Sequence, residues 1–194
     1  MQNKIPMKAF VINMLKEKLP ANYCYHNYEH TLYVLEKAIE IGTNEGCTKE
    51  EIKLLSAAAL WHDTGYINTY TGHEEASCLM AKKYLPEYGF SEEHVTKIVG
   101  MIMATKILQK PKNKLEEILA DADLEYLGTI DAPKKAHLLF KELQVLTPLL
   151  NEVEWNKMQI AFLESHHYFT NYCKTKKDPL KQSYLKKLIN EASL

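Results

Sequence analysis

Apolar residues recur along the chain at the spacing of α-helices. Between residues 49 and 63, Ile52, Leu55, Ala59 and His62 follow one another at steps of three, four and three, so they share one helix face. No convincing run of alternating β-branched residues with hairpin turns is found, which argues against a sheet. The chain is predicted to be all-α, with about eight helices of ordinary length packed on one core. Further helices are predicted over 92–106, 114–128, 131–146, 152–169 and 178–189.

Capping residues support several of these helices. Thr48, three residues before a glutamate, forms a capping-box pattern, and Ser91 and Asn113 stand at the N-cap positions of two further helices. Gly128 is expected to end the helix that begins at 114, and Pro133 lies at an early position of the next helix.

Size and composition limit the class of protein. The 194 residues suit one compact domain, and 46% apolar with 25% charged residues is typical of a globular fold. The formal net charge of -1 argues against a protein that binds nucleic acid through its phosphates.

Four cysteines lie far apart and form no C-x-x-C pair, which is typical of reduced thiols in a cytoplasmic protein. The first 20 residues have too short an apolar run for a signal peptide or a membrane span. We therefore expect a soluble, cytoplasmic protein with no membrane partner.

Two apolar stripes are interrupted by ionisable residues. His62 ends the stripe of its helix and Asp63 follows it, and an aspartate buried there needs compensation such as a divalent cation. The ordinary alternative is a polar helix end. In the stretch 114–128 a step of four places Asp123 among leucines, whereas Asp121 falls with glutamates on a face expected to be solvated. Asp123 is thus favoured over Asp121 as a ligand.

The stretch YCYHNYEHTLYV, residues 23–34, places His26 and His30 about one helical turn apart. Together His30, His62, Asp63 and Asp123 supply two imidazoles and two carboxylates from three helices. This mixed nitrogen and oxygen set suits Mn, Fe, Co, Ni, Mg or Zn rather than a thiolate-rich structural zinc site. Four protein ligands leave positions for water and for a phosphate oxygen.

At these residues the sequence resembles the HD superfamily of metal-dependent phosphohydrolases. The family has an adjacent His-Asp pair on a helix, an upstream ligand His and a distant ligand Asp, which here match LWHDTGY, YEHT and DADLEYLG. The likeness covers roughly residues 20–130, and 131–194 fits the variable C-terminal helices of one HD-type domain. It implies that His30, His62, Asp63 and Asp123 bind the metal.

A narrower likeness concerns YHNYEHT, which resembles the YHN-x-x-H motif of class I cyclic-nucleotide phosphodiesterases. It implies that His26 donates a proton to the leaving group and that His30 is the metal ligand. The Asp-Leu pair at Asp123 also matches the family. The segment after His62 is similar to that of a small bacterial branch of uncharacterised HD phosphohydrolases.

The sequence also departs from its relatives. Tyr66 stands where many bacterial members have Lys and the phosphodiesterases have His, and Thr105 or Lys106 occupies the neighbourhood of a His that two-metal members often carry. One ion is expected, and a second one only if His73 contributes. The likeness does not reach the purine-binding residues, so a cyclic nucleotide is not assigned.

The resemblance implies that a metal-activated water attacks phosphorus, with Asp63 at the ion and His26 as general acid. Asn27 either caps its helix or orients an imidazole, the cap being favoured. His73 and Glu74 either reach over the site or simply begin an acidic helix. Lys106 either contacts substrate phosphate or extends into solvent.

His166 and His167 either line the substrate pocket or belong to the structural core, and we leave them outside the predicted site. The predicted partner is a small phosphorylated substrate, with a nucleotide favoured, and the protein is expected to be a monomer or homodimer. Two other functions stay open: a non-catalytic HD domain that binds metal or nucleotide to regulate a partner, and an HD-fold di-iron oxygenase, which needs more His ligands.

Overall fold

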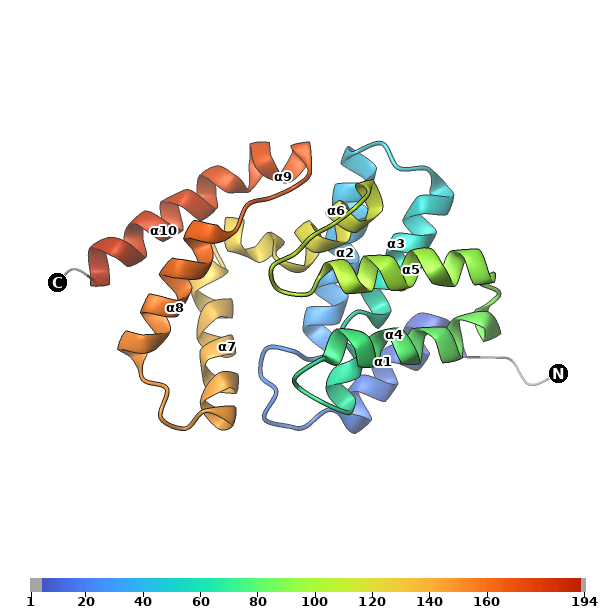
Figure 1. The fold of residues 1–194 in the computed structure, drawn as a ribbon, viewed down its shortest axis with the longest axis horizontal. Helices are drawn as coiled ribbons and strands as arrows, with labels where there is room; N and C mark the ends of the chain where they lie inside the picture. The colour runs from blue at the N-terminus through green and yellow to red at the C-terminus, as the bar shows by residue number, and fades with distance from the viewer. Residues whose placement is uncertain (1–4, 193–194) are drawn as a thin grey trace.

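This computed structural model describes residues 5–192, and most of this range is helical (Figure 1). The all-α prediction is confirmed, since this range holds ten α-helices, three short 3-10 helices and no strand. Ten α-helices exceed the roughly eight expected, and one of them has only six residues, too few to show a periodicity. In chain order they are α1 (Met7–Lys18), α2 (Tyr28–Asn44), α3 (Lys49–Trp61), η1 (Thr64–Ile67), α4 (His73–Tyr84), η2 (Leu85–Tyr88), α5 (Glu92–Ala104), α6 (Lys114–Asp123), η3 (Glu125–Gly128), α7 (Ala132–Leu146), α8 (Glu152–Ser165), α9 (Asn171–Lys176) and α10 (Asp178–Ala192).

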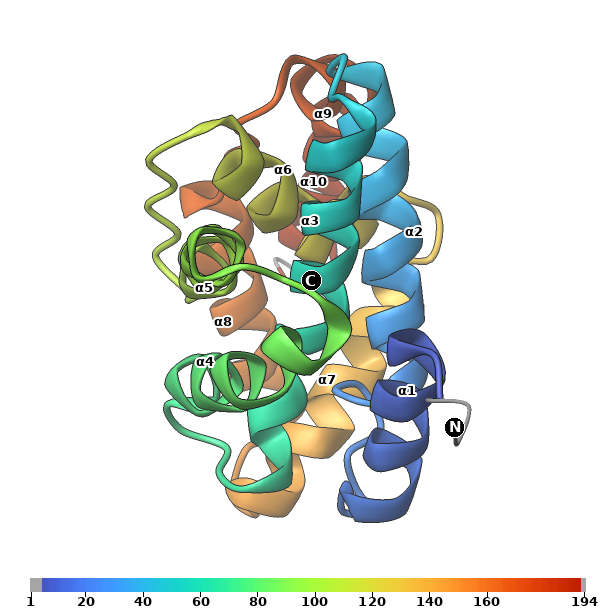
Figure 2. The ribbon, with the colours of Figure 1, turned by 90° about the vertical axis from the view of Figure 1, so that its right-hand side faces the viewer.

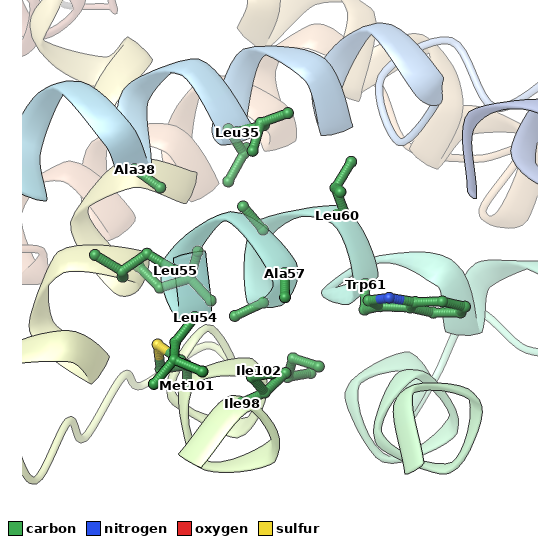
Figure 3. Close-up of a cluster of buried hydrophobic side chains, with 14 of the residues drawn as sticks. Leu35, Ala38, Leu54, Leu55, Ala57, Leu60, Trp61, Ile98, Met101 and Ile102 are labelled. Atoms are coloured by element: carbon green, nitrogen blue, oxygen red, sulfur yellow. The ribbon is translucent and has the colours of Figure 1, made fainter. Parts of the chain in front are cut away.

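The core is built around α3. Every residue of this helix from Leu54 to Trp61 except Ser56 is buried, because α2 packs on one side of it and α5 on the other. Figure 3 shows Leu35 of α2 and Met101 of α5 on opposite sides of α3. Figure 2 shows α2 and α3 side by side along most of their length. This packing holds the C-terminal end of α3 rigidly inside the protein, close to the first turn of α2.

The predicted caps are present. Thr48 and Glu51 form the capping box of α3, and the side chains of Ser91 and Asn113 cap α5 and α6. Pro133 lies in the first turn of α7, as expected.

Gly128 does not end the preceding helix, because α6 already ends at Asp123 and η3 follows it. A Cβ at Gly128 would lie 2.4 Å from the carbonyl oxygen of Lys177. Glycine is required here because the connection between α9 and α10 crosses η3 at close range.

The C-terminal helices pack against η3 rather than against α3. α10 contacts η3 and α8, and the ring of Phe140 in α7 stacks on Trp155 in α8 at a centroid distance of 5.6 Å. In Figure 1 these helices occupy the opposite half of the molecule from α1, α4 and α5. Among residues 5–192 no helix is both long and apolar enough to cross a membrane.

Candidate metal centre

His62 and Asp63 lie where α3 ends. The side chain of His62 is completely buried, and its Nδ1 lies 2.8 Å from the carbonyl oxygen of Ala59 in the last turn. Because a carbonyl only accepts, Nδ1 carries a proton, which leaves Nε2 as the ring nitrogen that can bind a cation. Asp63 begins the turn into η1 and is 6% exposed. The helix end thus directs one imidazole nitrogen and one carboxylate to the same point.

His30 and Asp123 reach this point from α2 and α6. Nε2 of His30 lies 3.0 Å from Oδ1 of Asp123 and 3.4 Å from Oδ2 of Asp63. Nε2 of His62 lies 3.1 Å from Oδ2 of Asp63 and 3.5 Å from Oδ1 of Asp123. The structure therefore brings together all four residues that the sequence proposed as ligands. Ligand atoms of His30, His62 and Asp123 all fall within 4.8 Å of one another.

Three atoms of this cluster are buried without a hydrogen-bond partner: Nδ1 of His30, Nε2 of His62 and Oδ2 of Asp63, of which the last two face each other. Unsatisfied buried polar atoms are costly, and an imidazole nitrogen and a carboxylate oxygen side by side can both bind one cation. A divalent cation accepts electron pairs from both, so the residues present fit a metal ion with nitrogen and oxygen ligands.

Mutual electrostatics hold the carboxylates ionised. Burial raises the pKa of Asp63, but the neighbouring imidazoles of His62 and His30 outweigh it and lower that pKa to about 2. Burial likewise opposes a low pKa at Asp123, yet the hydrogen bond to His30 and the adjacent imidazole of His62 keep that pKa below the usual range. Both carboxylates are thus ionised where a cation would bind.

Asp121 lies elsewhere, and the expectation that its face is solvated is wrong. It is fully buried and accepts hydrogen bonds from the backbone N–H groups of Phe169 and Thr170 and from the Thr170 hydroxyl. Glu125, on the same face, is also fully buried, and it pairs with Lys177. The segment before α10 covers this face of α6, so Asp121 has a structural role, while Asp123 points to the histidines.

A family model for the HD domain matches residues 27–125, about half of the chain. The chain belongs to the HD domain family. One solved structure with the same fold is that of a predicted HD superfamily hydrolase from an uncultured Thermotogales bacterium, with a TM-score of 0.64 and 20% sequence identity. That comparison covers 98% of this chain and 93% of the other. No curated protein matches the sequence.

His26 lies just outside the matched HD residues and does not join the four-residue cluster. Its Nδ1 lies 2.5 Å from Oε1 of Glu142 in α7, and its ring is 5.9 Å from that of His30. The ring of Tyr66 stacks on two imidazoles, with centroid distances of 4.3 Å to His26 and 3.9 Å to His73. Tyr66, the tyrosine at which the sequence departs from its relatives, therefore packs against both histidines.

His73 is the first residue of α4 and also lies next to Asp63. The two alternatives for His73, the start of a helix and a residue that reaches over the site, are therefore compatible. Its Nε2 lies 3.6 Å from Oδ1 of Asp63 and 3.5 Å from Oε1 of Glu74, and its Nδ1 donates to the carbonyl of Tyr70. Glu74 is buried. The imidazole of His73 thus lies next to Asp63, with the carboxylate of Glu74 beside it.

The remaining candidates lie further out. The predicted cap at Asn27 is confirmed, because its side chain accepts from the backbone of Glu29 and His30. Lys106 is exposed and forms an ion pair with Glu75. His166 contacts Lys181 in α10, and neither it nor His167 is among the residues that line the cavity beside the centre.

Sequence reasoning missed Glu142. Its carboxylate is fully buried and also accepts from the backbone N–H groups of Tyr25 and His26. It interrupts an apolar stripe between Leu139 and Leu143, the same signal that singled out Asp123.

Proposed function

We propose that this HD-domain protein is a metal-dependent phosphohydrolase. The observation that carries the proposal is the pair of unpartnered buried atoms, Nε2 of His62 and Oδ2 of Asp63, inside a set of two imidazoles and two carboxylates beside a cavity. His30, His62, Asp63 and Asp123 would hold the ion. When bound, a divalent ion lowers the pKa of a water and polarises a phosphoryl oxygen.

The chain's own groups supply the proton chemistry. Glu142 binds Nδ1 of His26, which leaves Nε2 of the same ring to serve the leaving oxygen as general acid. Tyr66 stacks on the ring of His26 and is itself stacked on His73, so it restricts the His26 ring. His73 and Glu74 stand beside Asp63, where they orient the attacking water or contribute to a second ion.

The similar solved structure is that of a predicted HD superfamily hydrolase, which agrees with this proposal. A non-catalytic regulatory domain gives no reason for the buried Glu142–His26 pair beside the ligands. A di-iron oxygenase needs further histidines, and Thr105 and Lys106 stand where they are expected. The substrate is a small phosphorylated molecule, and its being a nucleotide stays a prediction, as does the monomeric or homodimeric state.

The test is a screen of phosphate release from phosphoesters, nucleotides and diphosphates by protein loaded in turn with Mn, Fe, Co, Ni, Mg or Zn. Asp63→Asn should abolish turnover. Asp131→Asn, which changes an exposed aspartate away from the cavity, is the matched control and should behave as wild type. Turnover that persists in Asp63→Asn would exclude the proposed site.

A further inference from the structure

A cavity of about 530 Å³ begins at the metal centre and continues between η3, α7 and α8. Asp63, Asp123 and His26 line its inner end. Its far wall is mainly apolar and includes Leu127, Leu139, Leu143, Trp155, Met158 and Phe162. The volume is that of a small-molecule site rather than of a single phosphate ion.

Charge is confined to the inner end of this cavity. Among the described residues that line it, the one lysine or arginine is Lys106, and its ammonium already pairs with Glu75. The whole chain has 24 lysines and no arginine. Polyphosphates are bound by several cationic groups, with arginine favoured where bidentate contacts are needed. Among the described residues, the cavity has no further cationic side chains that could bind a second or third phosphate.

The polar groups of the far wall, Gln159 and Tyr184, bind one another. The hydroxyl of Tyr184 donates to Oε1 of Gln159 at 3.0 Å, and Nε2 of Gln159 donates to Asn156 at 3.2 Å. Trp155 is held flat against Phe140, with an angle of 17° between the rings. A rigid aromatic wall with internally satisfied polar groups favours an apolar, flat ligand.

We propose that the substrate is the ester of a single phosphate with an apolar, aromatic-sized alcohol, whose organic group occupies this cavity. This inference rests on the proposed function. The bond between phosphorus and the ester oxygen breaks, the oxygen of water bonds to phosphorus, and the ester oxygen leaves with a proton from Nε2 of His26. The products are the alcohol and inorganic phosphate, and His26 regains its proton from the water that was consumed.

The test compares kcat/KM for 1-naphthylmethyl phosphate, glycerol 1-phosphate and ATP in metal-loaded protein. The first two release primary alcohols, so their ratio reports the fit of the organic group more than leaving-group acidity. We expect the naphthylmethyl ester to be favoured by at least about 100-fold, because each methylene-sized contact in an apolar pocket contributes about tenfold or more.

A matched pair of variants assigns this preference to the cavity. Leu143→Gln changes a lining residue of α7, and Leu146→Gln changes an exposed leucine of the same helix outside the cavity. The ratio of naphthylmethyl to glycerol ester should fall about tenfold in Leu143→Gln and stay unchanged in Leu146→Gln. A variant that merely disturbed the fold would lower both rates together and leave the ratio intact.

Binding of 1-naphthalenemethanol without added metal, followed by tryptophan fluorescence, separates this inference from the proposed function. Saturable binding that Leu143→Gln weakens, with no ester hydrolysed, would overturn the hydrolase and leave the apolar selectivity supported. If ATP or glycerol 1-phosphate were hydrolysed with the same kcat/KM as the naphthylmethyl ester, the inference would be overturned and the hydrolase would stand. Neither binding nor hydrolysis would overturn both.

Discussion

Nδ1 of His26 lies 2.5 Å from Oε1 of Glu142, although 116 positions separate the two residues in the chain. The other carboxylate oxygen of Glu142 accepts the backbone N–H groups of Tyr25 and His26 at 2.8 and 3.0 Å. Burial raises the pKa of Glu142, but these hydrogen bonds and the His26 ring bring it below its usual value. An ionised carboxylate is thus held against one nitrogen of His26, so that only the other can act on substrate.

Glu142→Gln should lower kcat about 10–100-fold with little change in KM, and His26→Ala should lower it about 10²–10⁴-fold, because a positioned acid contributes that much. The measurement is steady-state kinetics on phenyl phosphate and 4-nitrophenyl phosphate. Nitrophenolate leaves without a proton, so both variants should be nearly normal with that ester.

Metal content should be unchanged in both variants. Equal losses on the two esters would contradict a proton-donor role for His26. Loss of metal in His26→Ala would mean that the roles of His26 and His30 are exchanged.

Asp121 and Asp123 are two positions apart, and their replacements should have opposite consequences. Asp121→Ala leaves the N–H groups of Phe169 and Thr170 without their acceptor, so the free energy of unfolding should fall by at least about 2 kcal/mol. Metal stoichiometry of the folded protein should be retained. Asp123→Ala should instead lose metal affinity while the metal-free protein stays folded. Urea unfolding and metal analysis check the pair, and the reverse pattern would make Asp121 the ligand.

Gly65 allows the start of α4 to approach η1 closely. A Cβ at Gly65 would lie 1.9 Å from the carbonyl oxygen of His73, and its N–H donates to Ser77 at 2.8 Å. Gly65→Ala should therefore lower the free energy of unfolding by about 1–3 kcal/mol and displace His73 from Asp63.

The control is Gly100→Ala in α5, where a new Cβ meets only the end of the Glu116 side chain. That variant should lie within about 1 kcal/mol of wild type in thermal or urea unfolding. Equal stabilities of the two variants would refute the close approach at Gly65.

His166 should make stability depend on pH. Burial and the adjacent Lys181 lower the pKa of His166 to about 3, against an ordinary value of 6.5. Between these values the unfolded chain binds a proton that the folded protein does not, so the free energy of unfolding falls as pH drops from about 6.5 towards 3. His166→Gln should reduce this fall between pH 7 and pH 5 by about 1 kcal/mol, measured by urea unfolding at the two pH values. His167→Gln, at the exposed neighbouring position, should keep the wild-type slope, and an unchanged slope in His166→Gln would refute the assignment.

Much of the metal centre could be predicted because it is encoded locally. His62 and Asp123 each interrupt an apolar stripe of one helix, and neighbouring stripes in a helical core must meet. The all-α fold follows from the same periodicity, as do the caps at Thr48, Ser91 and Asn113.

The features that could not be predicted from the sequence depend on contacts between segments that are far apart in the chain. Asp121 was placed on a solvated face because the stripe it shares with Glu125 is acidic, and only residues 169–177 turn that face into an interior one. Glu142 interrupts an apolar stripe, as Asp123 does. Its role, however, depends on its contact with His26, and no spacing in the sequence connects His26 with α7. The apolar cavity likewise forms only when α7 and α8 pack beside the centre.

Anomalous diffraction from crystals grown with Mn²⁺ tests most directly whether His30, His62, Asp63 and Asp123 bind one catalytic ion. We expect an anomalous peak about 2.0–2.3 Å from Nε2 of His30, Nε2 of His62 and one oxygen of each aspartate. A peak bound by other residues, or no peak among these four in protein that hydrolyses phosphoesters, would contradict it.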